Sequence, residues 1–186
     1  SNVAAEYGID REAQDAWALR SHQRAIAAID SGRMSEEIVP VTVAERGGQR
    51  LVAVDECPRC DTSREKLAQL KPVFTADGTV TAGNAPGVND GAGAFVLAAA
   101  EKARQWGVRP AAEILGHASV GAEAPYLATV PALAIQKLLA KTGYDMAAID
   151  LFEINEAFAA VTLTSQKLLG LPADKLNVNG GAIALG

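Results

Sequence analysis

The fold is decided by two stretches, Glu153-Ile154-Asn155-Glu156-Ala157-Phe158 and Asn177-Val178-Asn179-Gly180-Gly181-Ala182-Ile183-Ala184-Leu185-Gly186. The first places polar side chains at the end of a predicted buried strand, and the second is a glycine-rich loop that follows a further predicted strand. In open α/β sheets, ligands collect at the edge where strands give way to helices. We therefore expect both stretches to border the active site of an enzyme, of which the chain is an excerpt.

The first ninety residues predict helices and a hairpin. Asp10 is a plausible cap for a helix over 11–29, in which Leu19, His22, Ile26 and Ile29 share one face. Next come a hairpin, a short helix with a capping-box spacing, and a glycine-rich loop, at 38–43 with 51–54, 62–71 and 77–93.

The remaining residues predict strands that alternate with helices. Residues 94–99 fit either a buried strand or the start of a helix, because periodicity alone does not decide. Strands are expected at 114–120, 149–154 and 176–179, and helices at 101–106, 131–142 and 156–169. This alternation predicts an α/β layer with largely parallel strands, and we place a domain boundary near residues 88–93.

Composition limits the class of protein. The 186 residues are 49% hydrophobic and 21% charged, so a buried core is feasible. The net charge of −5 argues against nonspecific nucleic-acid binding, which needs a basic face. No apolar run is long enough to span a bilayer, and we see no secretory signal. Two cysteines in a chain of this length indicate a reducing compartment, so we expect a cytoplasmic protein.

Single residues leave alternatives open. Asn155 either caps the helix after it or positions a water or donates to a developing oxyanion. Arg59 either contacts an anion or is a solvated surface arginine. The glycine-rich loop at 77–93 is suited to close approach to a ligand, although it lacks the spacing of the known phosphate-binding motifs.

The cysteines and histidines favour structural interpretations. Cys57 and Cys60 form a Cys-x-x-Cys pair with no second pair to complete a metal site, so we expect no metal. His22 lies on the apolar face of its helix, where a satisfied, half-buried histidine is more common than a base. His117 follows a glycine, and the sequence pairs no nucleophile with it.

Taken together, these motifs resemble the thiolase family, the acyl-CoA acetyltransferases. The resemblance runs through nearly the whole chain in order, and its most specific parts are Asn155–Phe158 and Asn179–Gly186. Earlier parts are 7–15 with Ser21-His22, 70–74, 78–85 and 89–92.

The resemblance implies a layered αβαβα fold of two similar halves with a loop domain inserted in the first. Residues 1–88 would be the later part of that loop domain, and 89–109 the return segment of the N-terminal half. Residues 110–186 would begin the C-terminal half. The chain would then cover roughly the middle half of a complete enzyme.

The family's mechanism implies a nucleophilic cysteine that takes an acyl group from a coenzyme A (CoA) thioester, and a second cysteine that shuttles the proton. A histidine and a water held by the motif asparagine would stabilise the thioester oxyanion. Of these groups only the asparagine matches a residue here, Asn155. The nucleophile would lie before Ser1 and the histidine just after Gly186, while Cys57 and Cys60 match neither catalytic position. The 186 residues alone are therefore expected to be inactive.

The resemblance also implies positions that contact CoA. Arg59 would lie toward the nucleotide end, with Leu67 and Phe74 packing on the ligand. Ala82, Pro86 and Val88 would lie along the pantetheine arm, and Phe158 would lie near the reacting thioester. Pro86 departs from the usual serine, which removes a hydroxyl and a backbone N–H and should weaken CoA binding by on the order of 1 kcal/mol.

The implied activity is acyl transfer, most simply of an acetyl group, between CoA and an acyl-CoA by Claisen condensation or thiolysis. Acyl-CoA and CoA would be substrates, no prosthetic group is expected, and a homodimer or homotetramer is implied. A noncatalytic CoA-binding or interaction module is the alternative, and a Cys-x-x-Cys metal or redox protein is a third hypothesis.

Overall fold

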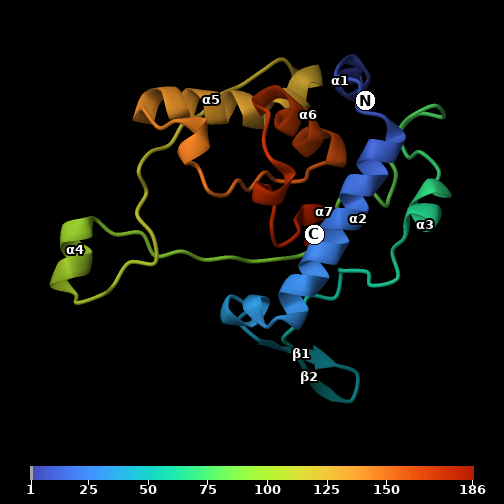
Figure 1. Cartoon of the computed structure of the whole chain (residues 1–186). Helices are drawn as coiled ribbons and strands as arrows, with labels where there is room; N and C mark the ends of the chain where they lie inside the picture. The colour runs from blue at the N-terminus through green and yellow to red at the C-terminus, as the bar shows by residue number, and fades with distance from the viewer. Residues whose placement is uncertain (1) are drawn as a thin grey trace.

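One long helix organises the chain in the computed structural model, which describes residues 2–186. This helix, α2 (Arg11–Asp30), runs through the middle of the molecule, with α6 (Ala159–Leu169) and α7 (Ala182–Leu185) packed against it (Figure 1). It begins at Asp10, whose carboxylate accepts a hydrogen bond from the N–H of Ala13 at 2.8 Å, as an N-cap does. The predicted helix at 11–29 is confirmed.

The buried face of α2 differs from the one that its aliphatic spacing predicts. Leu19, Ile26 and Ile29 are only partly buried. The positions that are buried carry small or polar side chains and one tryptophan: Gln14, Asp15, Trp17, Ala18, Ser21, His22, Ala25 and Ala28. Alanines permit close packing, and the polar groups need partners, because a buried polar group without a hydrogen bond is costly. Segments that are distant in the sequence supply those hydrogen-bond partners, and their positions decide which face of α2 is buried.

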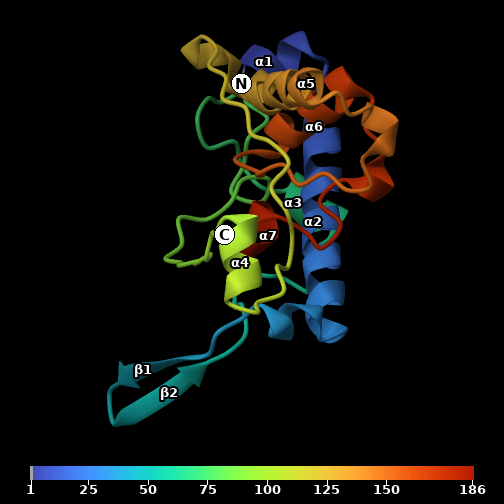
Figure 2. The same cartoon turned by 90° about the vertical axis from the view of Figure 1, so that its left-hand side faces the viewer.

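The predicted hairpin is confirmed with shifted bounds. β1 (Val41–Glu45) and β2 (Gly48–Val52) pair antiparallel, with Val41 opposite Val52 and Glu45 opposite Gly48. The hairpin projects from the body of the molecule (Figure 2). The short helix after it is α3 (Arg64–Ala68), and its N-cap is Ser63 rather than Thr62.

The helices of the second half lie close to their predicted positions. α4 (Ala100–Gln105) stands apart from the other helices at the end of two long connections (Figure 1), while α5 (Val130–Thr142) packs on α6. α6 begins at Ala159, three residues later than predicted, and α7 forms where a glycine loop was expected. The remaining elements are α1 (Asn2–Glu6) and the 3₁₀ turns η1 (Arg33–Glu36), η2 (Ala124–Thr129), η3 (Met146–Ala148) and η4 (Ala173–Lys175).

The three predicted parallel strands do not form as strands within residues 2–186. Residues 114–120 are irregular, as are residues 94–99, which are exposed. Residues 149–154 and 176–179 are joined by a single parallel bridge between Phe152 and Leu176. From 151 to 156 the side chains still alternate between exposed and buried, as in a strand. A strand is defined by its ladder of hydrogen bonds, and this segment finds only one neighbour in the described residues.

The main core lies between α2 and the C-terminal third of the chain. Its buried members come from α2, α3, the segment around Ile154, α6, α7 and the connection between α6 and α7: Trp17, Ala18, Leu67, Phe152, Ile154, Ala159, Leu171, Leu176 and Ile183. The core therefore joins the first helix to the stretches that carry Asn155 and the terminal glycines.

Candidate functional site

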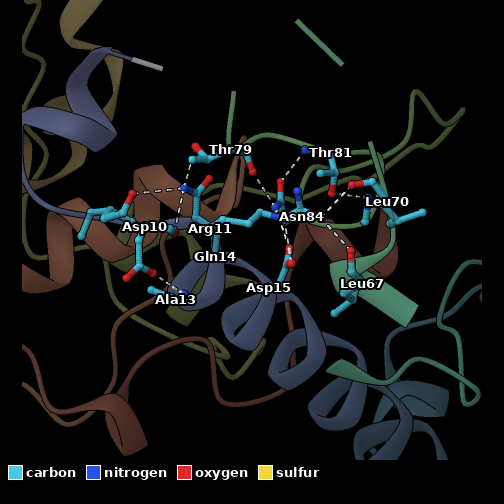
Figure 3. A network of polar contacts seen from close by, with 12 residues as sticks. Asp10, Arg11, Ala13, Gln14, Asp15, Leu67, Leu70, Thr79, Thr81 and Asn84 are labelled. Carbon is cyan, nitrogen blue, oxygen red and sulfur yellow. Dashed lines mark hydrogen bonds and ion pairs between the residues drawn. The ribbon is translucent and has the colours of Figure 1, made fainter. Parts of the chain in front are cut away.

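Buried polar groups on the first turns of α2 hold the loop at residues 79–84. The fully buried Asn84 donates from Nδ2 to Asp15 Oδ1 at 2.8 Å and to the carbonyl oxygen of Thr79 at 3.0 Å (Figure 3). Its Oδ1 accepts from the N–H of Thr81 at 2.9 Å. Gln14 Nε2 also donates to Thr79 Oγ1 at 2.9 Å. The loop that carries the predicted CoA contact Ala82 is thus fastened to α2 by side chains.

Arg11 extends the same network to α3. Its Nε donates to Asp15 Oδ2 at 2.7 Å, and its Nη2 donates to the carbonyl oxygens of Leu67 and Leu70 at 2.7 and 2.9 Å. One guanidinium therefore ties the end of α3 to α2 beside the 79–84 loop (Figure 3). We call the set Arg11, Gln14, Asp15, Thr79 and Asn84 the loop network.

Three of the predicted CoA contacts border one cavity. Arg59, Leu67 and Ala82 line a space of about 630 Å³, although Leu67 is only 4% exposed. Neither Pro86 nor Val88 is among the lining residues of this cavity. The other lining residues come from α2, α3, α7 and the loops on either side of α3, and include His22, Cys57, Lys66, Gly83, Gly87, Asn89 and Ile183. Pro86 is partly buried, and Val88 is fully exposed.

His22 anchors the loop that carries Arg59. The imidazole is buried, and its Nδ1 accepts a hydrogen bond from the N–H of Arg59 at 3.1 Å. Burial lowers the pKa of His22, and the charge of Arg59 lowers it further. The neutral ring thus serves as an acceptor for the loop, which agrees with the prediction of a satisfied helix histidine.

Two other predicted contacts meet in a separate, apolar cavity. The rings of Phe74 and Phe158 contact edge to face, with centroids 6.1 Å apart and planes at 76°. Both line a space of about 290 Å³ whose walls include Val80, Leu127 and Val161. Phe74 nevertheless remains 71% exposed, so its ring is accessible to a ligand.

The turn after the Phe152–Ile154 segment is built around a buried carboxylate. The side chain of Asn155 is exposed, whereas that of Glu156 is completely buried. Glu156 Oε1 accepts from Trp17 Nε1 at 2.8 Å and from Asn177 Nδ2 at 3.1 Å. Its Oε2 accepts from Ser21 Oγ at 2.7 Å and from the N–H of Ile183 at 3.0 Å. All four partners donate, as an ionised carboxylate requires.

Asn177 closes the other side of this turn. It has a φ of 47°, in the left-handed region that asparagine tolerates better than most residues. Its Oδ1 accepts from the N–H of Ile154 and its Nδ2 donates to the carbonyl oxygen of Ile154, both at 2.8 Å. The Asn177 side chain thereby makes the two backbone hydrogen bonds to Ile154 that a neighbouring strand would otherwise make. We call Trp17, Ser21, Glu156, Asn177 and Ile183 the turn network.

Two glycines permit the close packing of the turn network. A Cβ on Gly181 would lie 2.4 Å from Glu156 Cδ, and a Cβ on Gly180 would lie 2.7 Å from the carbonyl oxygen of Ser21. Neither position has room for a side chain. Sequence reasoning found these glycines and Asn155 but missed Glu156 and Asn177; the only local signal was their place inside the two quoted stretches.

Cys57 and Cys60 are both exposed and unpaired. Within residues 2–186, no three histidine, cysteine or acidic side chains come together as a metal site would require. In the same part of the chain, none of the helices combines the length and apolar character needed to cross a membrane.

Comparison with known proteins decides the family. The family model described as thiolase, N-terminal domain, matches residues 1–101, and that of thiolase, C-terminal domain, matches residues 108–186. The chain belongs to the thiolase family. An acetyl-CoA acetyltransferase of Chromobacterium violaceum is 52% identical over 186 residues, and a beta-ketoadipyl-CoA thiolase of Pseudomonas aeruginosa is 51% identical over 187. The chain spans 47% of the length of each of these thiolases.

Solved thiolase structures agree with this assignment. The Bacillus anthracis acetyl-CoA acetyltransferase superposes with a TM-score of 0.97 at 47% identity, and human mitochondrial 3-ketoacyl-CoA thiolase with 0.96 at 43%. All of this chain is covered in both cases, together with 47% of each solved chain. The helices and the parallel bridge between Phe152 and Leu176 are therefore part of an incomplete α/β thiolase fold, as predicted.

Proposed function

We propose that the whole protein is a thiolase-type acyltransferase, which moves an acyl group, most simply acetyl, between CoA and an acyl-CoA. The observation that carries this proposal is the match of both thiolase domains across the chain, at about half identity to proteins named acetyl-CoA acetyltransferase. The reaction is a Claisen condensation or its thiolytic reverse. Coenzyme A is a substrate in this scheme, and no prosthetic group is needed.

Asn155 is our candidate for the oxyanion side of the reaction. Its amide is exposed at the end of the Phe152–Ile154 segment, while the backbone around it is held by buried hydrogen bonds. A preorganised amide of this kind can hold a water against developing negative charge. Neither Cys57 nor Cys60 is assigned the nucleophilic role, because neither matches a catalytic cysteine position of the family.

We assign CoA binding to the predicted contacts, with Arg59, Leu67 and Ala82 at the larger cavity and Phe74 and Phe158 at the apolar one. Arg59 supplies positive charge for phosphates at the first cavity. The two rings supply apolar surface at the second. Pro86 and Val88 belong to the same loop as Gly87 and Asn89, which line the first cavity, and Pro86 offers no hydroxyl to the pantetheine amides.

The domain division 1–88, 89–109 and 110–186 is part of the same proposal. The N-terminal family model ends at residue 101 and the C-terminal one begins at 108, close to the proposed start of the last part at residue 110. Residues 88–99, an exposed and irregular stretch, have the character of a connection.

We further propose a cytoplasmic homodimer or homotetramer. Exposed, unpaired thiols such as those of Cys57 and Cys60 persist in a reducing compartment. Several large apolar side chains, including Phe95, Val96 and Trp106, are exposed. Exposed apolar surface of this kind is commonly covered by another protein surface, which supports an assembly. Multi-angle light scattering of the full-length protein tests the assembly, and a monomer at micromolar concentration would contradict it.

Thiolysis of acetoacetyl-CoA by the full-length protein tests the activity. We expect turnover, and a loss in kcat of about 100-fold or more for Asn155→Ala. The 186-residue chain alone should show none, so turnover by it would refute the assignment of the nucleophile to other residues. CoA binding without turnover by the full-length protein would favour the alternative, a noncatalytic CoA-binding module.

Calorimetric titration of the 186-residue chain with CoA tests the binding residues. Arg59→Ala should weaken binding about tenfold, as expected for one charge-assisted contact. Arg104→Ala is the matched control, since Arg104 lies on α4 in an exposed pair with Glu101. Equal effects of the two changes would remove Arg59 from the site.

A further inference from the structure

The carboxylate of Glu156 has no access to solvent or to a substrate. It is completely buried, and its four hydrogen-bond donors come from three separate parts of the chain. Trp17 and Ser21 belong to α2, Asn177 precedes the terminal glycines, and Ile183 lies in α7. A fully satisfied buried group of this kind specifies one arrangement of the elements that it joins.

The arrangement that it specifies is that of the Asn155 backbone. The residue before Asn155 is Ile154, whose N–H and carbonyl oxygen are both bonded to the side chain of Asn177. The residue after it is Glu156, whose carboxylate is held by α2 and by Asn177 itself. Asn155 is therefore fixed on both sides by one connected network, while Asn155 itself is exposed.

The same carboxylate positions the glycine stretch. Glu156 Oε2 accepts from the N–H of Ile183, and Ser21 Oγ, which donates to this oxygen, accepts from the N–H of Gly181 at 3.1 Å. Gly181 packs so closely on the carboxylate that a Cβ would overlap it. The distance between the Asn155 turn and the 180–186 stretch is thus set through one side chain.

We propose that Glu156 is a positioning residue for the acyl-transfer reaction, which acts by holding Asn155 in register with the glycine stretch. This inference rests on the proposed function. Glu156 touches no reacting atom and exchanges no proton in this role. The loop network on the same helix holds the CoA-binding loop instead, so the two networks serve different steps. Damage to the turn network lowers kcat, and damage to the loop network raises KM for CoA.

The first test compares kinetic constants of the full-length enzyme. Glu156→Gln keeps the shape of the side chain but turns an N–H₂ group toward groups that are themselves donors. We expect kcat for acetoacetyl-CoA thiolysis to fall roughly 10- to 100-fold, because small misplacements of a catalytic group have effects of that size. KM for CoA should stay within about twofold. Asn84→Ala should instead raise KM for CoA and leave kcat nearly unchanged. A rise in KM alone for Glu156→Gln would overturn the proposal.

The second test is a double-mutant cycle between Glu156→Gln and Asn155→Ala. If Glu156 acts through Asn155, the double variant should have the kcat of Asn155→Ala within about threefold, since the amide is already absent. Independent structural damage would instead multiply the two losses, and that result would overturn the proposal. Loss of all activity in Asn155→Ala with no effect of Glu156→Gln would overturn it as well, without touching the proposed function.

Two further variants keep the test decisive. Ser21→Ala removes one of the four donors and leaves the carboxylate, so it enters the same cycle if Glu156→Gln does not fold. Thr162→Val is the matched buried control, because Thr162 is fully buried in α6 and its hydroxyl has no partner among the described residues. It should leave kcat and KM within about twofold of the parent enzyme. If the losses of kcat in Ser21→Ala and Asn155→Ala multiply in the double variant, the proposal is overturned.

Discussion

The two polar networks on α2 are built differently. The loop network contains an ion pair, Arg11 with Asp15, and makes many of its contacts to backbone carbonyl oxygens in partly buried surroundings. The turn network gathers four neutral donors around one fully buried carboxylate. A network whose contacts are spread over several side chains loses less stability when one of them is removed. A network built around one carboxylate loses all of its contacts to that carboxylate at once. Helix α2 thus carries a distributed support, the loop network, and a concentrated one, the turn network.

The largest expected effect is the removal of the concentrated centre. Glu156→Ala leaves four buried donors without an acceptor, each costing about 1–3 kcal/mol, so we expect a loss of about 4 kcal/mol or more in the free energy of unfolding. Denaturation followed by tryptophan fluorescence measures it, because Trp17 is buried in this network. Asp150→Ala, at an exposed position just before the same segment, should cost about 0.5 kcal/mol or less. Similar losses for the two variants would contradict the comparison.

Overpacking the same centre should be the next largest effect. Gly181→Ala places a Cβ 2.4 Å from Glu156 Cδ, and the φ of Gly181 is −158°, so the cost is steric and not conformational. We expect a loss of about 3 kcal/mol in the free energy of unfolding. Gly48→Ala is the control, since nothing lies within 4 Å of its added Cβ. A neutral Gly181→Ala would show that the turn network yields more readily than its packing indicates.

The distributed support should lose less from a single change. Asn84→Ala deprives the N–H of Thr81, the carbonyl oxygen of Thr79 and Asp15 of one partner each, but Arg11 and Gln14 retain their contacts. We expect a loss of about 2 kcal/mol, measured by the same denaturation. Gln23→Ala, exposed on α2, should change stability by about 0.5 kcal/mol or less. A loss as large as that of Glu156→Ala would remove the contrast between the networks.

The smallest expected effect depends on pH. His22 has a pKa below its usual 6.5, because burial and the charge of Arg59 disfavour its protonated form. The unfolded chain then binds more protons than the folded one as pH falls through 6.5, so stability must decrease in that direction. His22→Gln keeps an acceptor for the N–H of Arg59 but cannot titrate. Its unfolding free energy should therefore fall less than that of the parent between pH 7.5 and pH 5.5, and parallel curves would exclude this role for His22.

Helices were predictable from local signals. The Asp10 cap begins α2, Pro131 stands in the first turn of α5, and glycines in the left-handed region end α5 and α6 at Gly143 and Gly170. Each signal acts on backbone groups within one or two turns. The strands predicted at 114–120, 149–154 and 176–179 do not form within the described residues, because a strand depends on a neighbour that local sequence does not name.

The candidate site was predictable in part. The family resemblance named Arg59, Leu67 and Ala82, which line one cavity, and Phe74 and Phe158, whose rings are in contact. It also drew attention to Asn155 rather than to Glu156. Nothing near Glu156 in the sequence shows that it is buried, because its hydrogen-bond partners are distant along the chain; Trp17, for example, is 139 residues away.

The sequence by itself determined the family and the helices, and it named the residues that we propose to contact CoA, because motifs and caps are local patterns. Only the tertiary structure decided which face of α2 is buried and which carboxylate organises the Asn155 turn. Burial of a polar group is favourable only when partners meet it, and these partners are brought together by packing between segments that the chain order keeps far apart.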